Sequence, residues 1–306
     1  MTNTSEPQTT EPQTSEFNPA ETDTSGIGPV LGTGGTGRSG ARLARLLTDR
    51  RVAVRIGSRH APVPFDWQDP RTWPLALSGV QAAYLCYSPD LAFPGAPETI
   101  AGVAASAAEA GVERLVLLAG RGEDGARAAE DAVRSSGLDW TVLRSAWFAQ
   151  NFSENFLLGP VRRGRLLLPA DGGVAEPFLN LDDLVEVAAD AFSTDRHVGR
   201  LLELTGPRLL TLHNVAAELT AALGRPIEFV SCSAEEFAAD LGIDGIPEDE
   251  GLPLARLFTE ILDGRNAVTS TDLARALNRE PTDFGDYATL AARSGVWDAP
   301  IGAARR

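Results

Sequence analysis

The sequence predicts an α/β fold built around a doubly wound parallel sheet. Two observations carry this prediction: short apolar segments alternate with helix-like segments, and the first apolar segment ends in a glycine-rich turn. Alternation of strand and helix implies right-handed crossovers and therefore parallel strands. The expected strands are 28–34, 51–59, 79–88, 112–120, 138–145, 200–206 and 226–233, and the expected helices are 38–50, 99–111, 125–137, 181–192 and 211–224.

Residue patterns justify the elements of the first half in turn. The first helix, 38–50, carries its leucines on one face. The strand after it, 51–59, alternates apolar and polar residues, whereas 79–88 and 112–120 are apolar runs typical of buried strands. The segment 99–111 is rich in alanine, the residue with the highest helix propensity.

The second half keeps part of this order. The helix 181–192 has Asp182 and Asp183 in its first turn, where negative charge favours the helix dipole. Thr211 is the expected N-cap of the next helix. Residues 235–251 hold seven acids, and we expect a solvated loop there.

Composition narrows the class of protein. The chain has 306 residues, 43% of them hydrophobic, and a net charge of −15, which argues against broad binding to nucleic acid or to anionic membranes. No apolar run approaches the ~18 residues of a membrane span, and no signal peptide is recognised. Cys86 and Cys232 form no disulfide framework, and no Cys/His cluster suggests a metal. A cytoplasmic protein without a metal is expected.

Residues 1–26 differ from the rest of the chain. The motif Glu-Pro-Gln-Thr occurs in them twice, and they contain five acids, no bases and almost nothing apolar. Such a segment buries too little surface to offset the entropy of ordering, so we expect a disordered acidic tail.

The glycine-rich turn predicts a dinucleotide site. Gly34, Gly37 and Gly40 have Gly-x-x-Gly-x-x-Gly spacing between a strand and a helix, which lets the backbone approach a pyrophosphate at a helix N-terminus. The stretch also lies close to a nucleoside-triphosphate P-loop, but the chain has no lysine to reach the phosphates. The remaining candidate residues of the turn are Gly35, Thr36, Arg38 and Ser39.

The residues after the second strand select the cofactor. NAD binders usually carry an acid about 20 residues after the glycines, whereas this chain has Ser58 and Arg59. An arginine suits the 2′-phosphate of NADP(H), and Arg38 adds charge; the alternative is that both arginines are solvated. Asp66 either accepts a hydrogen bond from the adenine amino group or caps a turn, and Ser88 completes the predicted cofactor site.

Few residues are available for acid catalysis. The Tyr-x-x-x-Lys pair of many short-chain dehydrogenases is impossible without lysine. Tyr87 ends a strand at the edge where α/β sheets bind ligands, so it is the candidate catalytic residue or else a wall of the nicotinamide site. Tyr84 is expected in the core. Three histidines are expected to be solvated: His60, His197 and His213.

An aromatic segment follows the strand 138–145. It mixes apolar walls with a few polar groups, as a ligand pocket requires; the alternative is ordinary packing between two lobes. The candidate substrate residues are Tyr87, Trp147, Phe148, Asn151 and Phe152.

These motifs together resemble a known family. The ordered series VLGTGGTGRSG, GSR, FDW, AAYLCYSP, ERLVLLAGRG, AEDAVRSSGLDWTVLRSAWFAQNF and FLNLDDLVEVAADAF is similar to the NmrA-like atypical short-chain dehydrogenase/reductases, on a branch resembling the ergot-alkaloid dehydrogenases. The resemblance covers roughly residues 28–300. It implies a Rossmann domain, a smaller C-terminal substrate lobe and bound NADP(H).

The expected protein is an NADPH-dependent reductase of an activated C=N, C=C or quinone acceptor. Its arginine- and alanine-rich, lysine-free composition suggests a role in bacterial secondary metabolism. Its expected partner is an aromatic or polycyclic small molecule, and it is expected as a monomer or homodimer. Two alternatives stay open: an NADP(H)-sensing regulator without turnover, and a non-redox cyclase or isomerase. The expected division is a tail (1–26), an NADP-binding domain (27–155) and the remaining sheet elements with the substrate lobe (156–306).

Overall fold

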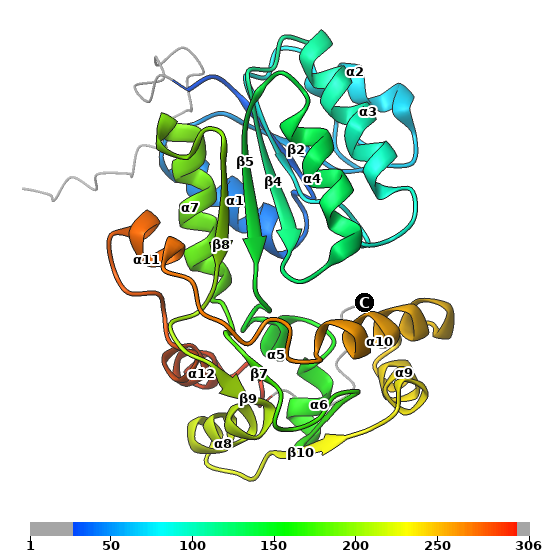
Figure 1. Cartoon of the computed structure of the whole chain (residues 1–306), viewed down its shortest axis with the longest axis vertical. Helices are drawn as coiled ribbons and strands as arrows, with labels where there is room; N and C mark the ends of the chain where they lie inside the picture. The colour runs from blue at the N-terminus through cyan, green and yellow to red at the C-terminus, as the bar shows by residue number, and fades with distance from the viewer. Residues whose placement is uncertain (1–26, 299–306) are drawn as a thin grey trace, which may run out of the picture.

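A computed structural model describes residues 27–298, so the tail predicted at 1–26 lies outside the described residues. Figure 1 shows an upper part containing a large sheet and a smaller lower part. The sheet has six parallel strands in the order β2-β1-β3-β4-β5-β8. These strands are β1 (Val30–Thr33), β2 (Val54–Gly57), β3 (Ala82–Leu85), β4 (Arg114–Gly120), β5 (Asp139–Ser145) and β8 (Arg200–Leu204).

Helices cover both faces of this sheet, because both faces are apolar. One face carries α1 (Arg38–Asp49), α7 (Leu181–Ser193) and α11 (Asp272–Leu277); the other carries α2 (Trp73–Leu77), α3 (Ala96–Glu109) and α4 (Arg127–Arg134). The strand order reverses between β1 and β3, so the chain leaves β1 toward one edge and later returns to its other side. This arrangement confirms the predicted Rossmann-type α/β fold.

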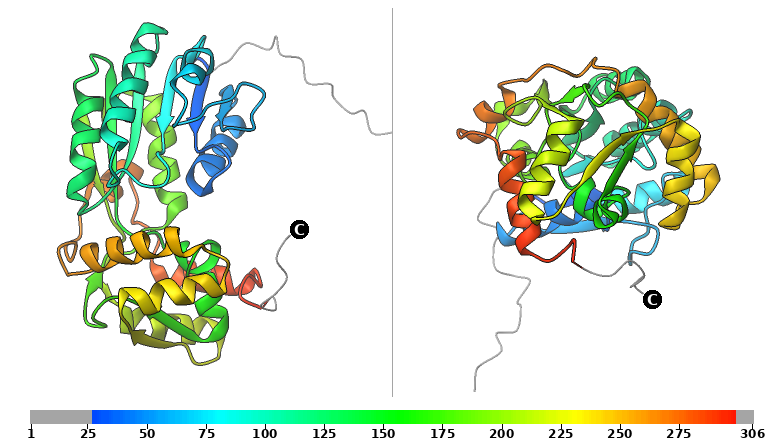
Figure 2. Two further views of the ribbon diagram at one scale, coloured as in Figure 1. Left: turned by 90° about the vertical axis from the view of Figure 1, so that its right-hand side faces the viewer. Right: turned by 90° about the horizontal axis from the view of Figure 1, so that it is seen from below.

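The lower part lies beneath the carboxyl ends of the strands, as the side view shows (Figure 2). A hydrophobic core of its own holds it together. Two small sheets belong to it, one parallel pair of β6 (Arg165–Leu168) with β10 (Glu228–Ser231) and one antiparallel pair of β7 (Ala175–Glu176) with β9 (Leu210–Thr211). Its helices are α5 (Asn151–Glu154), α6 (Leu158–Arg163), α8 (Leu212–Leu223), α9 (Ala234–Ile243), α10 (Glu248–Ile261) and α12 (Phe284–Arg293). Short 3₁₀ turns occupy Pro70–Thr72, Asp124–Ala126 and Asp195–His197.

The predicted loop at 235–251 is wrong. Helix α9 and the start of α10 occupy this segment. Ser233 caps α9 in a reciprocal box with Glu236, and the acids of the first turn suit the helix N-terminus. Phe237 and Leu241 are fully buried on the inner face. The acids therefore cover the outer face of a helix instead of marking a loop.

His197 also differs from its prediction. It was expected in solvent, but only 5% of it is exposed. Its Nε2 lies 2.9 Å from Asp190 Oδ2 at the end of α7. Burial lowers the pKa of His197. The predicted N-cap at Thr211 is confirmed, with Asn214 completing its capping box.

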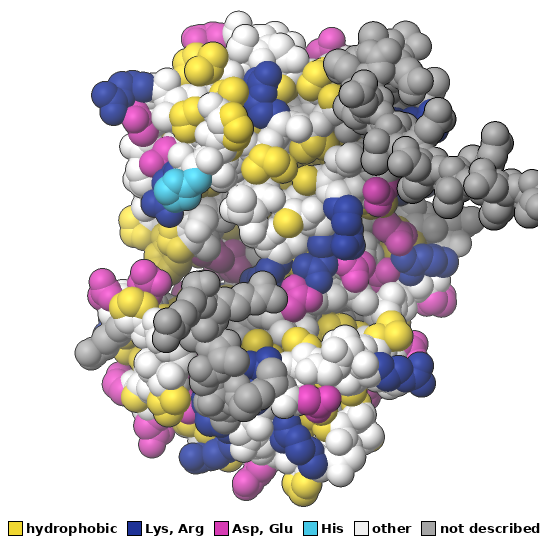
Figure 3. Space-filling model, turned by 180° about the vertical axis from the view of Figure 1, so that it is seen from behind, with side chains coloured by type: hydrophobic (Ala, Val, Ile, Leu, Met, Phe, Trp, Pro, Cys, Tyr) yellow, Lys and Arg dark blue, Asp and Glu magenta, His cyan; other side chains and the backbone are white. Residues whose placement is uncertain are grey.

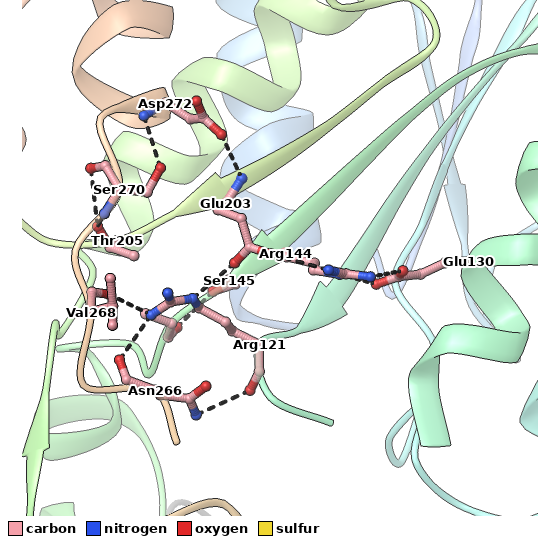
Figure 4. Close-up of polar contacts among 11 residues, drawn as sticks. Arg121, Glu130, Arg144, Ser145, Glu203, Thr205, Asn266, Val268, Ser270 and Asp272 are labelled. Carbon is pink, nitrogen blue, oxygen red and sulfur yellow. Dashed lines mark hydrogen bonds and ion pairs between the residues drawn. The ribbon is translucent and has the colours of Figure 1, made fainter. Parts of the chain in front are cut away.

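One connecting segment, residues 262–271 between α10 and α11, crosses the carboxyl edge of the sheet (Figure 4). Arg121 donates from Nη1 to the carbonyl oxygens of Asn266 and Val268, at 2.9 and 2.7 Å. The same guanidinium donates to Glu203 at 2.8 Å, and Glu203 also accepts from Arg144 at 3.1 Å. These contacts fix the connecting segment that follows α10 to the ends of strands β4, β5 and β8.

Within residues 27–298, no helix is long and apolar enough to cross a membrane.

Candidate functional site

The glycine turn lies where the sheet reverses its strand order. Gly34 has a φ of +61°, a left-handed conformation that favours glycine. A Cβ on Gly40 would clash with the carbonyl oxygen of Gly34, so only glycine lets α1 pack against the turn. Helix α1 begins at Arg38 and has no acid in its first turn. The turn thus presents free backbone amides and a positive helix end, which together form a cradle for a phosphate group.

Thr33 connects the two strands that flank this reversal. Its Oγ1 donates to the carbonyl oxygen of Tyr84 at 2.8 Å and accepts from the backbone N–H of Cys86 at 2.9 Å. The ends of β1 and β3 are therefore held in register beneath the turn. Tyr84 is completely buried in the core, as predicted, and burial raises the pKa of its hydroxyl.

A groove of about 500 Å³ opens beside the turn. Most residues predicted to bind the cofactor line it: Gly34, Thr36, Gly37, Arg38, Ser39, Ser58, Arg59, Asp66 and Ser88. The two remaining ones, Gly35 and Gly40, are buried behind the turn, where they permit close packing. Arg59 is exposed at the groove. Asp66 accepts from the backbone N–H of Gln68 at 3.0 Å, the turn-capping contact of the alternative reading, while it also lines the groove.

A second, larger cavity of about 890 Å³ lies between the carboxyl ends of the strands and the lower part of the molecule. Figure 3 shows the surface hollowed between the two parts, with acidic side chains at the recess. Helix α10 forms one wall. Its Phe258 packs edge-on against Trp147, with ring centroids 4.6 Å apart, and lies 5.0 Å from the ring of Phe156. The cavity therefore has an aromatic wall of inclined rings, which can pack against the faces or edges of an aromatic ligand.

The groove and the large cavity are continuous. They share six lining residues: Arg38, Cys86, Tyr87, Ser88, Leu118 and Phe148. The ring of Tyr87 packs against Trp67 of the groove at 5.1 Å. A dinucleotide lying along the groove would extend its far end into the cavity at Tyr87 and Phe148.

Arg38 stands at this junction. It donates from Nη1 to Oδ1 of Asn151 at 2.6 Å and lies 6.0 Å over the ring of Phe148. Burial lowers the pKa of Arg38, opposed by the charge of Glu154. The predicted substrate residue Asn151 therefore lines the cavity with its oxygen already held by Arg38.

Phe152 needs a correction. It was expected beside the ligand, but it is fully buried and does not line the cavity. It packs between Phe178 and Phe284 in the core of the lower part. The helix α5 turns the chain after Asn151, so the next side chain points away from the cavity. Trp147 and Phe148 do line it, whereas Phe152 belongs to the core of the lower part and not to a contact between the two lobes.

Among the cavity residues that the sequence analysis did not predict, two are acids that follow strands of the large sheet: Asp90 and Glu123. Each follows the carboxyl end of a strand, Asp90 after β3 and Glu123 after β4. Tyr87 was predicted from the rule that ligands bind at the carboxyl ends of parallel strands, and the same rule would have predicted both acids. Burial, followed by the charge of Asp90, raises the pKa of Glu123 to about 9. No group of three or more metal-ligating side chains occurs in the part of the chain that the structure describes.

The site combines three features: a Rossmann sheet, a glycine cradle where the strand order of that sheet reverses, and a cavity continuous with the cradle. Together they define the class of the NAD(P)-dependent oxidoreductases. Comparison with known proteins agrees with this class. No family model matches the chain. An uncharacterised oxidoreductase of Bacillus subtilis is 30% identical over 280 residues, which covers 88% of this chain and 96% of that protein. Agroclavine dehydrogenase of Claviceps fusiformis is 29% identical over 288 residues, covering 88% and 98%.

Among solved structures, an NADPH-dependent quinone oxidoreductase of Escherichia coli in complex with NADPH has the same fold, with a TM-score of 0.72 and 21% identity. The match covers 86% of this chain and 99% of that one. The chain belongs to the NmrA-like atypical short-chain dehydrogenase/reductases, on the branch that resembles the ergot-alkaloid dehydrogenases. It is an NAD(P)H-dependent oxidoreductase.

Proposed function

We propose that this protein is an NADPH-dependent reductase that transfers a hydride to an activated C=N, C=C or quinone acceptor with an aromatic or polycyclic body. One observation carries the proposal: the groove at the glycine turn opens directly into an aromatic-walled cavity at Tyr87 and Phe148. NADPH, when bound, supplies the hydride. The chain's own contribution is to hold the pyrophosphate at the turn, orient the acceptor and exclude water.

The choice of NADPH over NADH rests on the groove. Ser58 and Arg59 line it where an acid would be needed for the ribose of NADH, and the exposed guanidinium of Arg59 is free to approach a 2′-phosphate. The glycine cradle fits the group, because a side chain at Gly40 would fill the space that the helix end needs. We assign cofactor binding to residues 27–155, joined by the rest of the sheet from the following part of the chain.

The open cavity favours a reductase over a regulator that only senses its cofactor. A sensor has no need for about 890 Å³ of space at the end of the groove. An acceptor that is already electrophilic also needs little acid catalysis, so positioning supplies much of the rate. Bacterial secondary metabolism is the setting that we propose for this activity.

The test is oxidation of NADPH by the purified chain in the presence of three acceptors: a naphthoquinone, a cyclic enone and an N-alkylated cyclic iminium salt. We expect turnover with at least one of them and transfer of deuterium from NADPH deuterated at the nicotinamide C4 to the product. Tight NADPH binding without oxidation by any acceptor would contradict the proposal and favour the sensor. Product formation without oxidation of NADPH would favour the non-redox enzyme.

A further inference from the structure

A pair of carboxyl groups lies in the wall of the large cavity. Asp90 follows β3 and Glu123 follows β4, so both stand above the carboxyl ends of neighbouring parallel strands. Both side chains line the cavity, and they are near enough for each to shift the pKa of the other. Two neighbouring carboxyl groups repel each other when both are ionised, so one of them favours its protonated form.

Several contacts decide which carboxyl keeps the proton. Burial raises the pKa of Asp90, but the backbone N–H of Ala92 opposes this by donating to its Oδ1 at 2.8 Å, which favours the ionised form. Oε2 of Glu123 is buried and accepts no hydrogen bond from a described donor. Burial and the neighbouring Asp90 raise the pKa of Glu123 to about 9. Glu123 is therefore the protonated member at neutral pH.

The surrounding charges act in the same direction. Glu130 on α4 and Glu260 on α10 face Glu123 and raise its pKa further. Each of these acids is paired with an arginine, Glu130 with Arg144 and Glu260 with Arg265. The other charged residues that line the cavity are Arg38, Asp249 and Glu250.

We propose that Glu123 is the proton donor of this enzyme, acting on neutral acceptors whose reduction leaves an anion, such as conjugated ketones and quinones. The inference rests on the proposed reductase function and names the group that completes it. Glu123 reaches the same cavity as the acceptor, whereas Asp90 acts as a positioning residue that holds the proton on its neighbour.

The proton balance is simple for a conjugated ketone. A hydride, which NADPH would supply when bound, would form the new C–H bond at the β-carbon, and the π electrons would move to the carbonyl oxygen. That oxygen takes the proton of the Glu123 carboxyl, giving the enol, and a carboxylate remains beside Asp90. Two adjacent carboxylates repel each other, so Glu123 recovers its proton from water that enters the cavity. An iminium acceptor becomes a neutral amine on hydride transfer and needs no proton.

This difference between acceptors defines the experiment. In Glu123→Gln, we expect kcat/KM for the cyclic enone to fall by roughly 10²–10⁴, the usual contribution of a general acid. Reduction of the iminium salt by the same variant should change only a few-fold. Glu109→Gln, an exposed change on α3, is the matched control and should leave both reactions unaltered. Equal losses with the two acceptors, or no loss with either, would overturn the assignment.

The pH dependence gives a second readout. Enone reduction by the unchanged protein should be constant at low pH and fall as pH rises through about 9, because Glu123 then loses its proton. Asp90→Asn removes a negative neighbour and should move this descending limb to lower pH while iminium reduction keeps its profile. A limb that does not move would contradict the role of Asp90.

A measurement without turnover separates this inference from the proposed function. Infrared difference spectra between the unchanged free protein and Glu123→Gln should show one protonated carboxyl band at pH 7 that disappears above pH 9, because the band of protonated Glu176 is common to both proteins and cancels. Melting temperature and NADPH binding identify any variant that fails to fold. A folded protein that shows the band but reduces no acceptor would contradict the reductase function. A protein that reduces enones without the band would contradict only Glu123 as the donor.

Discussion

The groove and the large cavity are built in different ways, although they share six residues. The groove is formed by short segments that follow three neighbouring strands: the glycine turn at the end of β1 and the segments after β2 and β3. The cavity consists of side chains from segments as distant as 86–93 and 246–261, and its far wall is held by the connecting segment 262–271. Sites of the first kind can be read from local sequence, whereas sites of the second kind depend on the tertiary fold.

The stability of the far wall of the cavity should depend on pH more strongly than cofactor binding in the groove does. Glu176 on β7 is completely buried beside Arg121 and Asn266, and burial raises its pKa to about 8. The folded protein then holds a proton that the unfolded chain releases near pH 4.5. The free energy of unfolding should therefore fall as pH rises from about 4.5 to 8 and level off above that.

Glu176→Gln removes this dependence. Between pH 5 and pH 8.5, the free energy of unfolding of the variant should rise by on the order of 3 kcal/mol relative to that of the unchanged protein. Each unit of pKa shift corresponds to roughly 1.4 kcal/mol, and relaxation of the structure around the carboxyl group lowers the total. Urea unfolding at both pH values measures it, with the exposed Glu228→Gln as control. NADPH affinity should stay constant over the same range; a parallel loss would show that groove and wall are not separate.

Cofactor binding in the groove should weaken when a side chain is added to its glycine turn. Gly40→Ala places a Cβ against the carbonyl oxygen of Gly34, and overpacking of this kind costs about 1–3 kcal/mol. We expect NADPH to bind roughly tenfold to a hundredfold more weakly, measured by calorimetric titration. Gly242→Ala in α9 meets no neighbouring atom and serves as the control. Unchanged affinity in the Gly40 variant would show that the cofactor does not use this turn.

Arg59 tests the specificity of the groove. Removal of an opposite charge from the 2′-phosphate should cost about 1.5–3 kcal/mol. In Arg59→Ala, the preference for NADPH over NADH should accordingly fall by roughly tenfold or more, with NADH affinity unchanged. A preference that survives the substitution would leave Arg59 as a solvated side chain.

Tyr87 gives the smallest expected effect. It lies at the junction of groove and cavity, with its ring against Trp67, and we expect it to act as a wall. Tyr87→Phe keeps the ring, so kcat/KM should change only a few-fold with either a cationic or a neutral acceptor. A loss of 10²–10⁴ confined to the neutral acceptor would identify Tyr87 as the general acid in place of Glu123.

Much of the fold could be predicted, because the signals were local. The glycine spacing, the apolar strands and the Thr211 cap each depend on neighbouring residues, and the structure has all three. The acids of 235–251 led to a wrong prediction of a loop, because charge density alone does not distinguish a loop from an amphipathic helix. The spacing of Phe237 and Leu241, which face inward, is the pattern that indicates the helix. Phe152 was wrongly predicted to contact the substrate, because the direction of its side chain depends on the residue at which α5 begins.

The acids of the cavity escaped prediction for a different reason. Asp90 and Glu123 are separated by 33 positions in the sequence and ordinary as single residues. They become informative only when parallel pairing of β3 with β4 brings the strand ends together. The opposite wall lies on α10, whose first four residues fall in the wrongly predicted loop and for whose remaining residues the sequence analysis predicted no element.

The ion pairs of Figure 4 are built on arginine alone, since the chain contains no lysine. A guanidinium remains charged at every pH at which a protein stays folded. The cations that tie the connecting segment to the sheet therefore release no proton when the pH is raised. Buried acids such as Glu123 and Glu176, whose pKa values are raised to about 9 and about 8, add to the buffering capacity of the molecule above neutrality.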